Sequence, residues 1–357
     1  MITKTIIIAV MIALVIPMSC SKDRRGLDGA QEKALITAIA EDNLQEVERI
    51  CLDWKSKRPK NFVVTWLLHW AYTGQNNMKM ESILSSELDS FDEKHKKEAV
   101  TFAEQIVKAH GESAAAWTLL SNAQGRTGMN KESLNSADRA LSLDPECATA
   151  LINKGVVLGK NMGRYAEAIK YLDKAIEINR NNATAWNNKG TALWQMSRFE
   201  EAIKCFDKAI KISSNDAMAW NNKGLALGQM SRFEEAIKCF DEAIQINFNF
   251  SMAWSSKGWA LGQISRFEEA VKCYDEAIRI KPNDAEVWYN KGWTLVEMAR
   301  PKEAIKCYDK AIKLNPKHAK AWYNKGVALG QIGRFEKAIK CFDEAIKLNP
   351  NLSRRRE

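Results

Sequence analysis

The stretch WNNKGLALGQMSRFEEAIKCFDEAI, residues 220–244, contains two apolar stripes separated by a short polar connection. Trp220, Gly224 and Leu227 stand at i, i+4 and i+7, which places them on one face of a helix. Apolar residues recur at helical spacing again from Phe233 onward. A single hairpin cannot bury both stripes, so the stretch predicts two antiparallel helices that pack against neighbouring pairs of the same kind.

The same pattern returns every 34 residues along two thirds of the chain. Its first position holds Trp117, Leu151, Trp186, Trp220, Trp254, Trp288 and Trp322. Four residues later stand Ser121, Gly155, Gly190, Gly224, Gly258, Gly292 and Gly326. Seven such units tile residues 114–352, and the second is one residue longer near Lys160. This period predicts one elongated array of repeats rather than separate globular domains.

From the second unit onward, each unit continues with an alanine, an aromatic residue or leucine, and a second alanine, and four of the seven units close on proline. The pattern resembles the tetratricopeptide repeat, whose signature is W-x2-L-G-x2-Y, then A-x3-F-x2-A, then P. The resemblance implies an all-α, right-handed superhelical solenoid of antiparallel helix pairs that serves as a protein-binding scaffold. One departure recurs: lysine stands where leucine is usual, at Lys154, Lys189, Lys223, Lys257, Lys291 and Lys325.

Residues 1–20 have the features of an export signal. Lys4 precedes an apolar run of 11 residues from Ile6 to Ile16, shorter than the roughly 20 residues that span a membrane. The segment resembles a prokaryotic lipoprotein signal in which Cys20 is lipidated, although Pro17 and Met18 depart from that pattern. We therefore expect an extracytoplasmic protein anchored in a prokaryotic cell envelope. An ordinary cleaved signal and an uncleaved membrane anchor are the alternatives.

The remaining segments flank the repeats. Residues 21–113 have helical patterns at 30–52, 62–73, 77–89 and 92–109 but do not follow the period, so we interpret them as degenerate repeats that cap the N-terminal side. Residues 353–357 form a basic tail. We expect no capping helix after residue 350, so that the apolar stripe of Ile339, Phe342 and Ile346 is partly uncovered and open to oligomerisation.

The positive charge is concentrated near the C-terminal end. The chain has a net charge of +9, and residues 285–357 hold 16 Lys and Arg against 8 Asp and Glu. Such a polarised end favours an acidic partner or an anionic surface, and its alternative interpretation is a solvated face with a frayed tail. Binding of nucleic acid or an anionic polymer is therefore the alternative function. Interspersed acidic residues and the expected export make nucleic acid an unlikely partner.

Cysteine and histidine patterns exclude several chemistries. Five of the eight cysteines recur every 34 residues, at Cys205, Cys239, Cys273, Cys307 and Cys341. Equivalent positions of adjacent helical repeats lie about 8–10 Å or more apart, beyond the roughly 7 Å limit for a disulfide, so free thiols are predicted. The four histidines are widely separated, and no GxxxxGK[ST], GxSxG, HExxH or CxxC motif occurs. We therefore expect no catalytic site, no metal and no cofactor.

The first helix of each unit carries the candidate binding residues. Two places after the tryptophan position stand Asn153, Asn188, Asn222, Ser256, Asn290 and Asn324. An asparagine amide both donates and accepts, so a row of them can bind the main chain of an extended peptide or protein segment. The row looks like the asparagine ladder of O-linked N-acetylglucosamine transferases. The alternative is that repeat duplication alone preserved these residues.

Further residues of the same helices complete the predicted groove. They are Gln195, Gln229, Gln263 and Gln331, together with Trp194, Trp259 and Trp293. The carboxylate clamp that some relatives use for chaperone C-termini is disfavoured. Its candidate positions hold Thr184, Met218, Met252, Glu286 and Lys320, of which only the last is basic.

Overall fold

The computed structural model describes residues 34, 35, 37–39, 41, 43–57 and 93–351, and the regular elements among them are all helices. The predicted signal segment, the helices expected at 62–73 and 77–89, and the tail at 353–357 lie outside this part of the chain. By its internal contacts the chain divides into two compact units, Met1–Ala219 and Trp220–Glu357. The all-α prediction is thereby confirmed.

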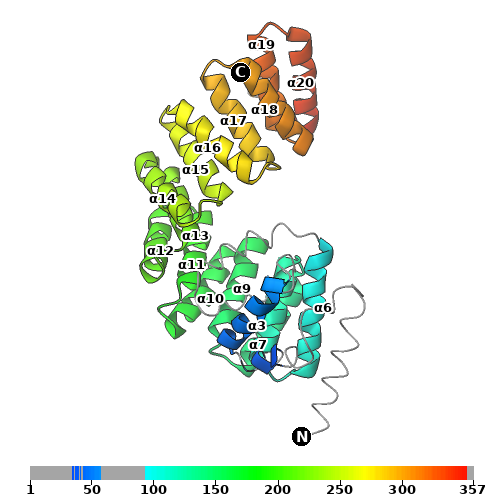
Figure 1. The fold of residues 1–357 in the computed structure, drawn as a ribbon, viewed down its shortest axis with the longest axis vertical. Helices are drawn as coiled ribbons and strands as arrows, with labels where there is room; N and C mark the ends of the chain where they lie inside the picture. Colours follow the sequence, from blue (N-terminus) through cyan, green and yellow to red (C-terminus); the bar gives the residue numbers. More distant parts are fainter. Residues whose placement is uncertain (1–33, 36, 40, 42, 58–92, 352–357) are drawn as a thin grey trace. The chain divides into compact units, whose positions relative to one another are not determined.

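Helices of the first unit pack in consecutive pairs (Figure 1). They are α3 (Leu44–Lys57), α6 (Glu93–Ala109), α7 (Ala114–Arg126), α8 (Asn130–Leu143), α9 (Ala148–Val156), η1 (Val157–Asn161), α10 (Tyr165–Ile178), α11 (Ala183–Gln195) and α12 (Phe199–Ile212). The pairs are α7 with α8, α9 with α10, and α11 with α12. The π-helix η1 occurs in the repeat that is one residue longer. The single inserted residue is accommodated there as one wide helical turn.

The second unit repeats this arrangement. Its helices are α13 (Ala217–Gln229, of which the first three residues belong to the first unit), α14 (Phe233–Ile246), α15 (Ser251–Gln263), α16 (Phe267–Ile280), α17 (Ala285–Glu297), α18 (Pro301–Leu314), α19 (Ala319–Gln331) and α20 (Phe335–Leu348). Each second helix contacts the first helix of the next pair, as α14 contacts α15. The predicted helix pairs and their stacking are therefore present within each unit.

The N-terminal helices share one hydrophobic core with the first pair. Ile39 and Val47 are fully buried in a cluster that includes Ala103 of α6 and Leu119 of α7. Within the helical pattern expected over 30–52, the chain turns at Glu41 before α3 begins. This packing against α7 is what a cap on the N-terminal side requires, while the assignment of 21–113 as degenerate repeats stays a prediction.

The glycine of the repeat permits close packing between the first and the second helix of that repeat. A Cβ atom on Gly190 would lie 2.6 Å from Cε1 of Phe206, and one on Gly224 would lie 2.6 Å from Cε1 of Phe240. Both rings are almost completely buried. The glycine is therefore needed because the aromatic ring of the second helix lies directly on the backbone of the first.

The tryptophan of the repeat forms a hydrogen bond with the loop that precedes its own helix. The Trp288 indole Nε1–H donates to the carbonyl of Pro282 at 3.0 Å, six residues earlier. The same bond recurs at Trp117, Trp186, Trp254 and Trp322. Tryptophan thus contributes both apolar area and a hydrogen bond to an otherwise exposed loop carbonyl.

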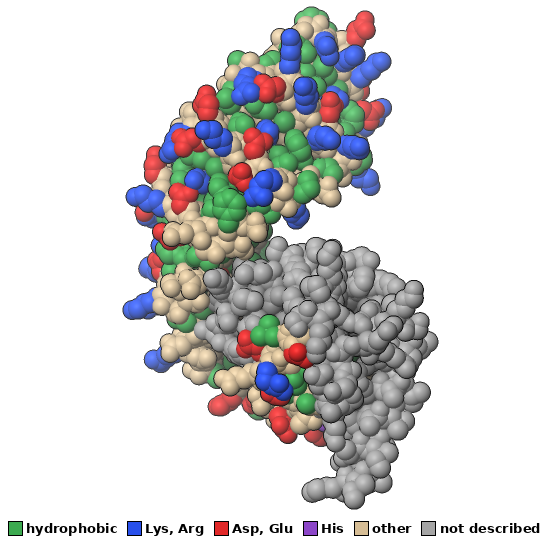
Figure 2. Space-filling model, viewed as in Figure 1, with side chains coloured by type: hydrophobic (Ala, Val, Ile, Leu, Met, Phe, Trp, Pro, Cys, Tyr) green, Lys and Arg blue, Asp and Glu red, His purple; other side chains and the backbone are tan. Residues whose placement is uncertain are grey.

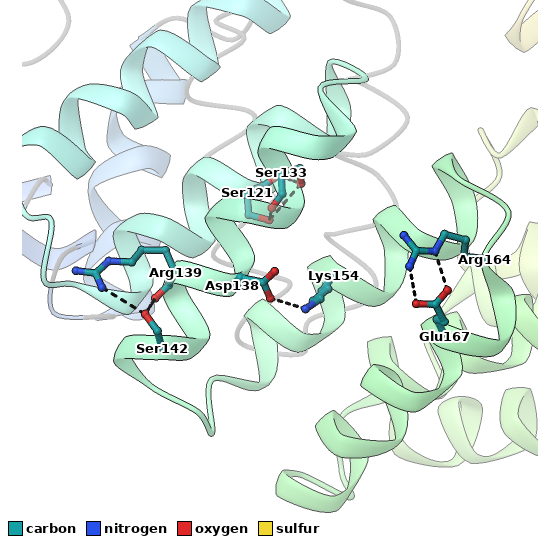
Figure 3. A network of polar contacts seen from close by, with 8 residues as sticks. All are labelled: Ser121, Ser133, Asp138, Arg139, Ser142, Lys154, Arg164 and Glu167. Atoms are coloured by element: carbon teal, nitrogen blue, oxygen red, sulfur yellow. Dashed lines mark hydrogen bonds and ion pairs between the residues drawn. The ribbon is translucent and has the colours of Figure 1, made fainter.

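The recurrent lysine links consecutive pairs. Lys291 Nζ lies 2.5 Å from Asp275 Oδ1 on the preceding second helix, and the lysine also lies over the Trp288 ring. Figure 3 shows the equivalent pair, in which Lys154 of α9 points to Asp138 of α8. Because these lysines are largely buried, their ion pairs are less screened than fully exposed ones. This explains why lysine replaces the usual leucine.

The described cysteines are free thiols, as predicted. The five recurrent cysteines are 4–6% exposed and lie on second helices. Burial raises the pKa of Cys205, Cys273 and Cys307 to about 11, so they stay protonated at neutral pH. They therefore act as small apolar side chains. Cys20 lies outside the described residues.

Candidate binding surface on the first helices

The first helices carry every repeat residue predicted to bind a peptide. Asn153 is on α9, Asn188 with Trp194 and Gln195 on α11, Asn222 with Gln229 on α13, Ser256 with Trp259 and Gln263 on α15, Asn290 with Trp293 on α17, and Asn324 with Gln331 on α19. Within each of the two compact units, these residues occupy equivalent positions of successive first helices. Binding of a peptide by them stays a prediction.

Two asparagines of the row are used by the array itself. Asn153 is 6% exposed, and its Nδ2 donates to the carbonyl of Thr118 on α7 at 3.1 Å. Asn153 therefore does not face solvent, because α7 of the preceding pair lies against it. Asn324 Nδ2 likewise donates to the Tyr289 hydroxyl on α17 at 3.1 Å. These amides therefore connect neighbouring first helices.

Two other asparagines remain available to a ligand. Asn188 and Asn290 are partly exposed, and their side-chain amides form no hydrogen bond with any residue that the structure describes. Asn222 is also partly exposed, whereas Ser256 is 8% exposed. An exposed amide without an internal partner presents donors and an acceptor together. Some asparagines of the row therefore bond within the array, whereas others present their amides to a ligand.

Glutamine and tryptophan side chains differ in their exposure. Gln195, Gln229, Gln263 and Gln331 are exposed, and each is the last residue of its helix. Trp259 lies against the backbone of Gly228 and meets the Phe233 ring edge-on, with ring centroids 5.8 Å apart. Trp293 lies over Gly262, and Trp194 is half-buried. Trp259 and Trp293 therefore pack between repeats, a role that the groove prediction did not include.

A polar aromatic cluster in the second unit was missed from the sequence. Nδ1 of His318 accepts from the backbone N–H of Ala321, and Nε2 lies 3.3 Å from Glu286 Oε1. The His318 ring lies 4.8 Å from that of Tyr289, centroid to centroid. Burial, followed by the charge of Glu286, raises the pKa of the Tyr289 hydroxyl. Tyr289 directly precedes Asn290, and that adjacency was the signal that could have revealed it.

The charge on this unit is mixed rather than of one sign. Figure 2 shows basic and acidic side chains interspersed on the visible face of its described part. Several basic residues of the C-terminal end form ion pairs, including Arg300 with Glu303 and Lys325 with Asp309. No cluster of three or more His, Cys, Asp or Glu residues that could hold a metal occurs in the described ranges.

No helix in the described part of the chain combines the length and apolarity needed to cross a membrane.

The fold is shared with several solved structures. The APC/C hetero-tetramer Cut9–Hcn1 matches 89% of this chain and 58% of its own, at 15% identity and a TM-score of 0.63. PilF of Pseudomonas aeruginosa matches 58% of this chain and 93% of its own, at 21% identity and a TM-score of 0.51. YrrB, a TPR protein described as having an unusual peptide-binding site, matches 50% of this chain and 92% of its own, at 26% identity and a TM-score of 0.42.

Sequence comparisons give the same family. None of the curated protein sequences matches the chain significantly. Sequence models of the tetratricopeptide repeat match residues 146–215, 217–250, 285–318 and 319–352, and a TPR repeat model matches 258–298. The pair α7–α8 lies outside these matches, so the count of seven repeats stays a prediction. The chain is therefore built, over most of residues 146–352, from tetratricopeptide repeats.

Proposed function

We propose that this protein is a non-catalytic scaffold that binds extended segments of a protein partner along its first helices. The tetratricopeptide-repeat fold itself indicates a protein–protein interaction scaffold. The observation that supports the finer proposal is the state of Asn188 and Asn290. Their partly exposed amides recur at the same position of the repeat and have no partner among the described residues.

The spacing of the repeats suits an extended chain. Packed helices lie about 8–10 Å apart, whereas an extended peptide advances about 3.3 Å per residue. Within one compact unit, one amide per first helix can therefore reach the main chain at roughly every third residue. Because the amide pairs with main-chain N–H and C=O groups, such recognition tolerates varied side chains. The exposed glutamines at the helix ends extend this polar surface.

Combined substitution of the amides should weaken peptide binding. We expect Asn188→Ala, Asn222→Ala, Asn290→Ala and Asn324→Ala together to weaken a peptide selected from a random library on the wild type. At about 1 kcal/mol for each lost hydrogen bond, the two amides without an internal partner, Asn188 and Asn290, account for a weakening of about thirtyfold. Isothermal titration measures this affinity. The Asn188→Ala and Asn290→Ala double variant should keep wild-type stability, because neither amide bonds within the described chain.

A charge variant provides the matched control. Lys337, Lys340 and Lys347 lie on the second helix α20, so reversing them to glutamate should leave peptide affinity within about twofold. If the asparagine variant still binds and the charge variant does not, the binding is instead that of an anionic ligand at the basic end.

We further propose that the scaffold is anchored in a prokaryotic cell envelope through lipidated Cys20. The support is the sequence of residues 1–20. Cys20→Ala should release the protein from the membrane fraction and leave an unprocessed precursor, whereas Ser21→Ala should change neither. Intact-mass measurement checks this, and wild-type protein that retains residues 1–19 would contradict it.

A further inference from the structure

The pair α19–α20 presents a copy of an internal interface that no helix of the described residues covers. We call it the end face and define it by Gly330 of α19 and by Phe335, Ile339 and Asp343 of α20. Three repeat periods earlier, Gly228, Phe233, Ile237 and Asp241 occupy the equivalent positions of α13 and α14. All eight residues belong to the second unit, so the two sets can be compared directly.

The internal copy is covered by α15. The Trp259 ring lies on Gly228, where a Cβ atom would come within 2.5 Å of it, and meets Phe233 edge-on. Lys257, two residues before this tryptophan, places its Nζ 2.5 Å from Asp241 Oδ1. Ile237 is only 8% exposed as a result. One lysine and one tryptophan of a single helix thus contact three positions of the interface.

The end face lacks each of these contacts. No atom of the described part of the chain lies within 4 Å of a Cβ atom built on Gly330. Phe335 is 67% exposed and Ile339 is 58% exposed. Asp343 has no ion-pair partner among the residues that the structure describes, whereas Asp241, Asp275 and Asp309 each pair with a lysine. The apolar area, the flat glycine site and the carboxylate therefore form a surface shaped for a helix like α15.

We propose that the end face binds a helix of a partner protein that carries a lysine and, two residues later, a tryptophan or phenylalanine. The lysine pairs with Asp343, and the aromatic ring lies on Gly330 against the edge of Phe335. This interaction surface is formed by Gly330 of α19 and three residues of α20, and it does not depend on the peptide-binding role of the asparagine row.

Other occupants fit less well. Residues 352–357, LSRRRE, contain no lysine and no aromatic residue. A second copy docked through the same face would bring Asp343 together with Asp343, and like charges repel in such an interface. The chain's own Lys-x-Trp sequences stand at 257–259, 291–293 and 320–322, and the tryptophan of each already packs within the array. The charge and shape of the face therefore favour a helix from another protein.

A synthetic copy of α15 tests the proposal. The probe is a fluorescein-labelled peptide of residues 251–263, SMAWSSKGWALGQ, titrated with the full chain by fluorescence anisotropy. We expect saturable binding. Gly330→Leu should weaken it at least tenfold by occupying the site of the tryptophan, and should leave the fold intact because nothing lies within 4 Å of the new Cβ. Thermal unfolding by circular dichroism verifies that the variant is folded.

A double-mutant cycle isolates the ion pair. Asp343→Asn should weaken the peptide about threefold to tenfold, but should not weaken a peptide in which the lysine is replaced by glutamine. The variant with all four asparagines changed should bind the α15 peptide normally, so failure here is distinguishable from failure of the proposed function. Equal affinity for wild type and Gly330→Leu, or no saturation by about 1 mM, overturns the proposal. A wild-type dimer in ultracentrifugation that Phe335→Glu dissociates also overturns it, because the face would then belong to a second copy.

Discussion

Asp216→Asn is expected to abolish most of the loss of stability that the wild-type protein undergoes as the pH rises from about 4 to about 7. Asp216 is completely buried just before α13, where its Oδ1 accepts from the backbone N–H groups of Met218 at 2.9 Å and Ala219 at 3.0 Å. Its Oδ2 is buried without a partner among the described residues. Burial raises the pKa of this carboxyl to about 7, although the two backbone N–H groups lower it in part.

The direction of the pH effect follows from linkage. The folded-state pKa lies above the ordinary value of 3.8, so the folded protein favours the protonated acid. This contribution is fully present below about pH 4 and is lost as the pH rises through about 7. Each pKa unit corresponds to about 1.4 kcal/mol, so the loss amounts to roughly 2–4 kcal/mol. Asparagine cannot ionise, and Asn182 already occupies the equivalent buried position before α11.

Urea unfolding at pH 4.5 and pH 8 measures this effect. Asp216→Asn should gain about 2–4 kcal/mol at pH 8 and change little at pH 4.5. Asp284→Asn is the control, since Asp284 caps α17 in the same way but is partly exposed, so its profile should follow the wild type. Equal destabilisation of Asp216→Asn at both pH values would show that the buried charge is not the cause.

The second large effect concerns Gly224 and Gly330, two glycines on first helices. An aromatic ring lies against the first and not against the second. Gly224→Ala places a Cβ atom 2.6 Å from Cε1 of the completely buried Phe240 ring, which has no room to move. Overpacking of this kind costs about 1–3 kcal/mol, partly offset by the better helix propensity of alanine. Gly330→Ala meets nothing within 4 Å and should gain about 1 kcal/mol.

Denaturant unfolding of the two variants should therefore show opposite signs. We expect Gly224→Ala to lose about 1 kcal/mol net and Gly330→Ala to gain about 1 kcal/mol. The substitution is chemically identical and both sites are on first helices, so the difference isolates the ring contact. A similar loss in both variants would mean that the glycines are needed for backbone reasons and not for the approach of the ring.

Much of the fold could be predicted from periodicity, because each repeat uses the same contacts. The tryptophan, glycine and aromatic positions predicted the helix pairs, and the equal spacing of cysteines predicted free thiols. The lysine before each glycine was recognised as a departure without a cause. Its cause is the aspartate of the preceding pair, such as Asp275 for Lys291, and no pattern within one repeat reveals that partner.

The candidate surface was less predictable, because side-chain exposure depends on neighbouring repeats. Asn153 and Asn290 occupy the same repeat position, yet Asn153 bonds to the carbonyl of Thr118 and Asn290 has no partner in the described chain. Trp259 was expected on the groove, but Gly228 of the preceding first helix, α13, provides a flat site for its ring. A one-residue insertion also became a π-helix, which the period alone does not specify.

Site-specific photo-crosslinking tests the binding surface most directly. A photoreactive amino acid replaces one of the exposed residues Gln195, Gln229, Gln263 or Gln331 on the first helices, or one of the exposed residues Lys204, Lys238, Lys272 or Lys340 on the second helices of the same repeats. Each variant is irradiated with the selected peptide and analysed by mass spectrometry. If the first helices bind the peptide, adducts form from the glutamine positions and not from the lysine positions. Equal adducts from both sets, or adducts from the lysine positions alone, would contradict the proposed function.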